Sequence, residues 1–98
     1  MGIYVYIGRD GPEGASLRAT VRERHLAHLR GLDAAGRIVF AGPLRDAAGA
    51  PCGSVVVFEA DDLSEARGIA EGDPYLVEGV FDRVDVHESM QVFPASGD

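Results

Sequence analysis

Two short segments that lie far apart in the chain carry residue types that can move protons. His25 follows Arg22 at the spacing Arg-x-x-His, and Asp73 stands directly before Pro74 and Tyr75. An aspartate that accepts a hydrogen bond from one imidazole nitrogen fixes the tautomer and leaves the other nitrogen as a base near neutral pH. A lone helical histidine is more commonly packed and hydrogen-bonded, however, and an acid before a proline is commonly solvated or caps a turn. The residues alone leave both interpretations open.

Other residues could in principle bind a metal, act as a nucleophile or bind a phosphate, but their spacing does not match the patterns of such sites. His28 follows His25 as His-x-x-His, which a metal site can use, yet no cysteine or third histidine has suitable spacing. Cys52 lies in an expected loop without a matching Cys–His arrangement, and His87 has no partner signal. The run Gly8–Gly11 lacks the spacing and the strand-to-helix context of a phosphate loop. We therefore predict no metal, no nucleotide cofactor and no cysteine nucleophile.

The hydrophobic pattern predicts the elements that must position these residues. Helix ends are expected at Ser16, as the cap of a first helix, and at Gly36, as its left-handed end. Asp62 and Glu65 fit a capping box at the start of a second helix. Strands are expected at 3–7, 37–41, 54–60 and 80–86, helices at 17–36 and 62–72, a further helical turn at 75–78, and a strand extension or arm at 90–93.

The order β-α-β-β-α-β predicts an α+β, ferredoxin-like fold, in which two helices cover one face of an antiparallel sheet. Gly42 and Pro43 are expected to stop the second strand, and residues 44–53 to form a hairpin loop, part of which (44–52) could act as a lid. The run Val55–Phe58 has no polar alternation, so both of its faces should be buried and something must cover the second face. Two sheets packed face to face would do so.

The first helix should direct His25 toward the sheet or its rim. The histidine lies angularly between Val21 and Leu32 on an apolar face, whereas Arg18 and Arg24 belong to a group of charged residues that mostly lie elsewhere on the wheel. Both helices are expected on the same side of the sheet, and this makes a meeting of His25 with Asp73 plausible.

Composition limits the class of protein. Ninety-eight residues predict one domain, 1–98, with a frayed end at 94–98. The net charge of −7 disfavours binding to nucleic acid or to an anionic membrane surface. A single cysteine, no secretory signal and no long apolar run predict a cytoplasmic protein. All nine basic residues are Arg, which we interpret as GC-rich bacterial coding.

Motifs along nearly the whole chain, from residue 3 to residue 93, resemble those of the YciI-like (YCII-related) family. The matching segments are Arg22-x-x-His25-Leu26, Ala41-Gly42-Pro43, Gly53-Ser54 and Asp73-Pro74-Tyr75. Members of this family resemble dimeric α/β barrels. The resemblance therefore implies a homodimer or higher homo-oligomer with a small pocket in which a histidine and an aspartate meet, here His25 and Asp73.

The resemblance also implies an activity and its residues. His25 would be the general acid/base, oriented by Asp73, in a cofactor-free enzyme with lyase-, dehalogenase- or isomerase-like chemistry on a small molecule, aromatic or cyclic in some relatives. The remaining site residues would bind the substrate or shape the pocket: Arg22, Ser54, Gly42, Pro43 and Tyr75.

Two alternatives stay open. One is a binding or accessory protein that uses the same pocket without turnover. The other is a cofactor-free monooxygenase of the related dimeric α/β-barrel type, which the paired motifs around His25 and Asp73 disfavour.

Overall fold

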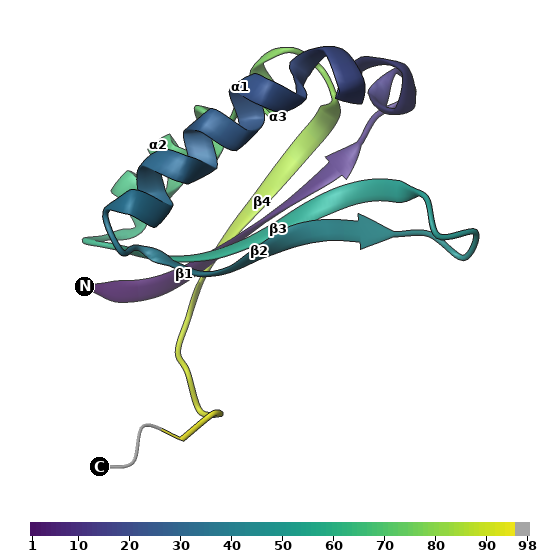
Figure 1. Ribbon diagram of the computed structural model, residues 1–98. Helices are drawn as coiled ribbons and strands as arrows, with labels where there is room; N and C mark the ends of the chain where they lie inside the picture. The colour runs from purple at the N-terminus through teal and green to yellow at the C-terminus, as the bar shows by residue number, and fades with distance from the viewer. Residues whose placement is uncertain (96–98) are drawn as a thin grey trace.

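The computed structural model describes residues 1–95, so the predicted frayed end at 94–98 lies mostly outside the described residues. One four-stranded antiparallel sheet, in the order β2-β3-β1-β4, carries all the helices on one face (Figure 1). This confirms the predicted ferredoxin-like fold. No described helix is long and apolar enough to cross a membrane. The elements are β1 (Gly2–Asp10), α1 (Gly14–Ala34), β2 (Ile38–Arg45), β3 (Pro51–Ala60), α2 (Leu63–Glu71), α3 (Pro74–Val77) and β4 (Phe81–Ser89).

The core lies between the sheet and the helices. Alternate residues of the two central strands point to the helix side, because side chains alternate between the faces of a strand. Tyr6 of β1 pairs with Val56 of β3 in the register of the sheet, and both are completely buried. Phe58 packs edge-on against Tyr6, with ring centroids 5.7 Å apart. The fully buried side chains that α2 adds to this cluster are small, Ala66 and Ala70, and partly buried Ile69 packs against it.

The other face of the sheet is apolar at its centre and is not covered by any described element, while β4 adds exposed polar side chains to the same face. Val57 of β3 stands opposite Val5 of β1 and Phe40 of β2, and Phe40 is 58% exposed. Val55 and Val57 are half-buried, while Val56 and Phe58 are buried. The prediction that both faces of this strand are buried therefore holds for the helix side, whereas the other side is half-buried in a single copy.

Helix α1 begins earlier than predicted. It starts at Gly14 rather than Leu17, with Glu13 as its cap residue, and Ser16 does not cap it but donates a hydrogen bond to the carbonyl of Glu13. A Cβ atom at Gly14 would stand 2.8 Å from the side chain of Asp10. This tertiary contact between the end of β1 and the start of α1 requires the glycine, and the predicted local capping signal did not include it. At the other end, Gly36 has φ +73°, as predicted.

Strand β2 runs through Gly42 and Pro43, which were predicted to stop it. Because β2 is an edge strand, half of its N–H groups have no strand partner, and a proline is tolerated there. Strand β3 correspondingly begins at Pro51, so only residues 46–50 of the predicted loop lie outside the strands. Asp46 closes this turn through hydrogen bonds from the N–H groups of Ala48 and Ala50.

The second and third helices have clear caps. Asp62 accepts a hydrogen bond from the N–H of Glu65, and the Glu65 carboxylate accepts one from Asp61 instead of from the cap residue itself. The predicted extra turn after Pro74 is α3, with Asp73 as its cap. Strand β4 ends at Ser89, so the predicted extension at 90–93 is an arm that leaves the sheet (Figure 1).

Candidate active site

His25 and Asp73 meet beneath α1. Nδ1 of His25 lies 2.8 Å from Oδ1 of Asp73 and 3.0 Å from Oδ2. Asp73 is completely buried and His25 is 6% exposed. The helix delivers the histidine, and the cap position before Pro74 delivers the aspartate, because proline holds the preceding residue in an extended conformation. The two residues therefore form a buried pair with normal hydrogen-bond geometry.

Asp73 is held in its charged form by three donors. Besides His25, the Tyr75 N–H donates to Oδ1 at 2.9 Å and the Tyr6 hydroxyl donates to Oδ2 at 2.8 Å. Burial by itself would raise the pKa of Asp73, but the hydrogen bond and charge of His25, together with the donors of Tyr75 and Tyr6, outweigh it and lower the pKa below its usual value. A charged Asp73 orients the imidazole so that Nδ1 carries the shared proton.

The other ring nitrogen of His25 faces the pocket. Nε2 has no hydrogen-bond partner among the described residues, and it is not one of the fully buried unpartnered atoms, so it keeps contact with solvent. The ring stacks on Tyr75 with centroids 3.9 Å apart and an interplanar angle of 4°. The ring of Phe81 contacts both the His25 and the Tyr75 rings edge-on. Strand β1 needs glycine at position 8, because a Cβ atom there would stand 2.3 Å from the Phe81 ring.

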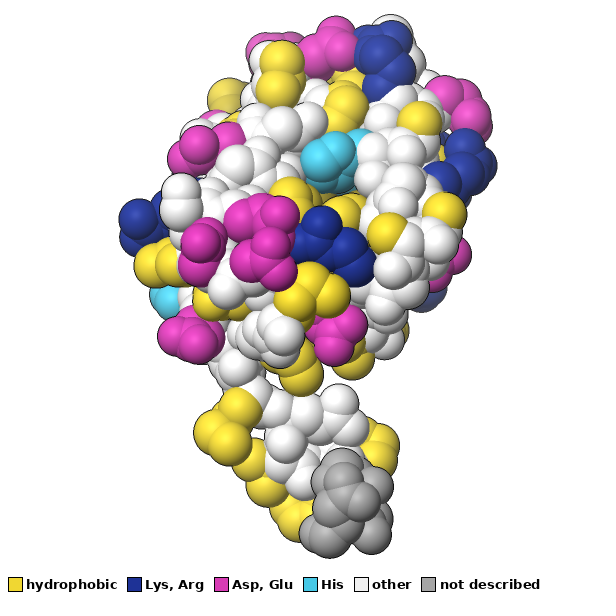
Figure 2. All heavy atoms as spheres, turned by 90° about the vertical axis from the view of Figure 1, so that its left-hand side faces the viewer, with side chains coloured by type: hydrophobic (Ala, Val, Ile, Leu, Met, Phe, Trp, Pro, Cys, Tyr) yellow, Lys and Arg dark blue, Asp and Glu magenta, His cyan; other side chains and the backbone are white. Residues whose placement is uncertain are grey.

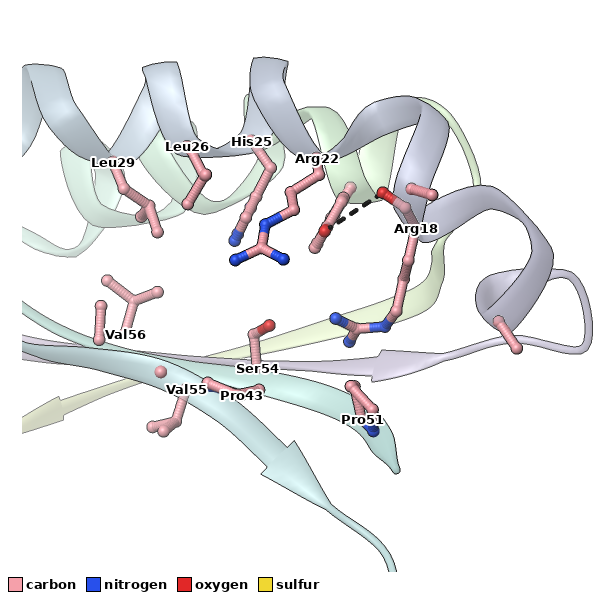
Figure 3. Close-up of a pocket in the computed structure, with 15 residues that line it drawn as sticks. Arg18, Arg22, His25, Leu26, Leu29, Pro43, Pro51, Ser54, Val55 and Val56 are labelled. Atoms are coloured by element: carbon pink, nitrogen blue, oxygen red, sulfur yellow. Dashed lines mark hydrogen bonds between the residues drawn. The ribbon is translucent and has the colours of Figure 1, made fainter. Parts of the chain in front are cut away.

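A pocket of about 560 Å³ opens next to His25, between α1 and the β2–β3 side of the sheet. Figure 3 shows that the side chains from α1 point toward the sheet in the order Arg18, Arg22, His25, Leu26 and Leu29, at helical spacing. Opposite Leu26 and Leu29, the sheet contributes Val56 and Ala41, so one end of the pocket is apolar and the other is cationic. None of the described lining residues is acidic, although the chain contains 16 acids.

Arg22 is available for a ligand. Its guanidinium reaches into the pocket beside His25 (Figure 3), and among residues 1–95 it forms no ion pair or hydrogen bond. The neighbouring Arg24 points elsewhere and pairs with Glu78 at 2.6 Å. An exposed arginine without an acidic partner in a chain of net charge −7 is suited to hold an anionic group.

Arg18 also lines the pocket, contrary to the expectation that it lies away from the sheet. It donates two hydrogen bonds to Asp10, at 2.7 and 2.8 Å, and one to the carbonyl of Gly53 at 3.0 Å. Its hydrogen bond with Asp10 raises the pKa of Arg18. The long side chain bends back from α1 to the ends of two strands, which a helical wheel does not take into account.

The other predicted binding residues also lie at the pocket. The hydroxyl of buried Ser54 rises from β3 toward the pocket and has no hydrogen-bond partner among the described residues (Figure 3). Gly42 and Pro43 lie in the β2 wall of the pocket, where they are part of a strand. Tyr75 lines the pocket beside His25.

The residues that we did not favour do not line this pocket. His28 has a buried Nε2 without a hydrogen-bond partner, and within residues 1–95 no three potential metal ligands gather. Cys52 is half-buried at the start of β3, and His87 is exposed on β4. Figure 2 shows histidine atoms in a hollow near the centre of this face and further histidine atoms at its left edge.

Sequence reasoning missed Tyr6 and Arg18. Tyr6 was treated as an apolar strand residue, but its hydroxyl contacts Asp73. The spacing of Arg18, Arg22 and His25, four and then three residues, places them on one helix face and is a signal that could have identified Arg18. No local signal indicates the partner of Tyr6, because that contact joins residues 67 positions apart.

The fold and this pocket define a small α+β protein of the dimeric α/β-barrel superfamily. The YCII-related domain family matches residues 3–89, and the chain belongs to this family. Protein YciI of Escherichia coli is 34% identical over 97 residues, which cover 93% of this chain and 99% of that protein.

Two solved structures are similar in fold. TftG, a 5-chloro-2-hydroxyhydroquinone dehydrochlorinase from Burkholderia phenoliruptrix in complex with 2,5-dihydroxybenzoquinone, superposes with a TM-score of 0.81 at 26% identity, over 91% of this chain and 94% of its own. A putative antibiotic biosynthesis monooxygenase from Nitrosomonas europaea has a TM-score of 0.50 at 14% identity, over 96% and 95% of the chains. This second likeness concerns the fold alone.

Proposed function

We propose that this protein is a small cofactor-independent enzyme in which His25 is the general acid/base, oriented by Asp73, for elimination or isomerisation of a small anionic ring compound. One observation carries the proposal. Nδ1 of His25 lies within hydrogen-bond distance of a buried carboxylate, while Nε2 of the same ring opens into a pocket without acidic lining. That arrangement presents an unprotonated nitrogen where a substrate would bind.

The chemistry follows from the charges around the ring. Nε2 takes a proton from a C–H or O–H group of the substrate, and the electron pair that remains expels a leaving group with its own bonding pair or shifts to a neighbouring atom. The imidazolium formed in this step is stabilised by Asp73, which is ionised at neutral pH because its pKa is lowered. The proton then leaves to solvent or returns to the product.

The two ends of the pocket suggest the kind of substrate. Arg22, with Arg18 behind it, is suited to a carboxylate or phenolate, and Ser54 can donate a further hydrogen bond. Leu26, Leu29 and Val56 can bury an apolar ring. The resemblance to TftG, whose described reaction is a dehydrochlorination of a hydroxylated ring, supports elimination as the reaction class.

The test is turnover of hydroxylated haloaromatic compounds by the wild type, His25→Gln and His28→Gln. His28 lies on the same helix three residues later and does not line the pocket, so its variant is a matched control. We expect His25→Gln to lower kcat by about 10²–10⁴-fold with the fold retained, and His28→Gln to keep activity. Tight binding by the wild type with no product from any compound would contradict the enzyme and favour a binding protein.

We further propose that two copies associate through the open face of the sheet. Ile3, Val5, Ile7, Val55, Val57 and Phe40 form a continuous apolar surface there by their register. Such a surface on a chain of this size is suited to bury itself against an equivalent sheet. The membership of the chain in a family that resembles dimeric α/β barrels supports this arrangement.

A further inference from the structure

Tyr6 places a hydroxyl group in the interior next to the proposed catalytic pair. The residue is completely buried on the helix side of β1, and its hydroxyl donates to Oδ2 of Asp73 at 2.8 Å. A buried tyrosine usually directs its hydroxyl to whatever acceptor is close. Here that acceptor is the carboxylate of Asp73, which orients His25, so the Tyr6 hydroxyl can affect the orientation of the imidazole ring.

We infer that Tyr6 is a positioning residue: its hydroxyl fixes the rotation and charge of Asp73 and thereby keeps the proton of His25 on Nδ1. The inference rests on the proposed function of His25. Tyr6 does not itself line the pocket, and in this inference it acts through Asp73. It is therefore distinct from the residues that would contact substrate.

The orientation of the carboxylate needs more than one donor. Both oxygens of Asp73 lie within 3.0 Å of Nδ1, so the contact with His25 alone does not select one rotation of the group. The Tyr75 N–H holds Oδ1 from α3, and the Tyr6 hydroxyl holds Oδ2 from β1. These two donors fix the plane of the carboxylate from opposite sides of the core, and His25 then meets a rigid acceptor.

The two fixed donors also keep their protons. The backbone N–H of Tyr75 does not titrate. Burial and the adjacent charge of Asp73 raise the pKa of Tyr6, so its hydroxyl stays protonated at neutral pH. Of the three donors to Asp73, only the His25 ring changes its charge during a catalytic cycle, and it does so at Nε2, away from the carboxylate. The charge of Asp73 is thus held constant while His25 gains and loses a proton at Nε2.

Tyr6→Phe removes this hydroxyl and leaves the ring packing against Phe58 in place. Tyr4→Phe is a matched control, because Tyr4 lies two residues earlier on the same face of β1, is 5% exposed and also packs near Phe58 at 6.4 Å. The Tyr4 hydroxyl forms no hydrogen bond within residues 1–95. Both changes remove one oxygen from a buried tyrosine, and only one of them touches Asp73.

The first measurement is NMR of the histidine ring nitrogens and the Asp73 carboxyl carbon across pH. In the wild type and Tyr4→Phe we expect His25 to carry its proton on Nδ1. In Tyr6→Phe we expect a mixture of tautomers, and a rise in the pKa of Asp73, since a donor to the charged form is lost. In turnover, kcat should fall on the order of tenfold with KM unchanged, with the acid limb of the pH–rate profile displaced relative to Tyr4→Phe.

The results separate this inference from the proposed function. A Tyr6→Phe protein with the ring tautomer and carboxyl titration of Tyr4→Phe overturns the role of Tyr6 alone. A wild-type ring that already carries its proton on Nε2 contradicts the proposed base itself. If Tyr6→Phe does not fold, the wild type still provides a test: a hydroxyl proton of Tyr6 that exchanges freely with solvent, without a contact to Asp73, overturns the inference.

Discussion

The imidazole of His25 lies parallel to the ring of Tyr75, with centroids 3.9 Å apart and an angle of 4° between the planes. The same Tyr75 donates its backbone N–H to Asp73, the hydrogen-bond partner of that imidazole. One residue of α3 thus supports both members of the pair, one through its ring and the other through its backbone. In the segment Asp73-Pro74-Tyr75, the first residue therefore holds the imidazole by a hydrogen bond and the last residue supports both the imidazole and Asp73.

Tyr75 can be tested by comparing Tyr75→Ala with Tyr75→Phe. The side chain is 3% exposed, so Tyr75→Ala should lower the free energy of unfolding by about 3–5 kcal/mol and leave the His25 ring unsupported. Tyr75→Phe keeps the stack and loses only a long, 3.5 Å contact from the hydroxyl to the Arg18 carbonyl, so its cost should stay below about 1 kcal/mol. Denaturant unfolding measures both, and equal losses in the two variants would show that the stack contributes little.

Asp73 predicts a specific dependence of stability on acid. The folded state lowers the pKa of Asp73 below its ordinary 3.8, so the unfolded state binds more protons in acid. The stabilisation is therefore complete above the unfolded pKa and is lost as the pH falls through the folded pKa. Unfolding of the wild type and Asp73→Asn from pH 7 to pH 2 should show a difference in free energy that shrinks below about pH 4. A difference that stays constant down to pH 2 would contradict the assigned shift.

Arg22 should contribute to ligand binding and little to the fold. Because it has no ion-pair partner within the described residues, Arg22→Gln should leave the unfolding free energy nearly unchanged and weaken binding of an anionic ligand by about tenfold or more. Arg24→Gln is the control, since Arg24 lies two residues away and pairs with exposed Glu78. Calorimetric titration with a hydroxybenzoquinone or a phenolate at two salt concentrations measures the effect. Equal affinities of Arg22→Gln and Arg24→Gln for the ligand would show that Arg22 does not contribute to binding.

The open sheet face predicts that the protein self-associates. The wild type should sediment at twice the chain mass of 10.4 kDa, and Val57→Asp should sediment as a monomer because it places a charge in the middle of the apolar face. Thr20→Asp adds the same charge on the exposed side of α1 and should stay dimeric. A wild type that is monomeric at high concentration, or a Val57→Asp dimer, would exclude this face as the interface.

Much of the fold could be predicted because its signals are local. Alternation of apolar residues, the caps at Asp62 and Gly36, and the proline after Asp73 each depend on a few neighbouring residues, and they specify the order β-α-β-β-α-β. Errors occurred where a neighbour in space decides the boundary. The edge position of β2 lets the strand continue through Pro43, and the packing of Asp10 against Gly14 accompanies the earlier start of α1.

In the candidate site, too, local sequence signals predicted some features and three-dimensional contacts decided the others. The sequence alone determined that His25 faces inward from a helix and that Pro74 disfavours a helical conformation at Asp73, because helical periodicity and the restriction before proline are properties of the local chain. Only the tertiary structure decided that the two residues touch, that Tyr6 completes the set of donors to Asp73, and that Arg18 bends back to Asp10. The first two contacts join residues 48 and 67 positions apart, and the third spans only eight positions. The geometry of all three depends on how α1 and α3 pack on the sheet.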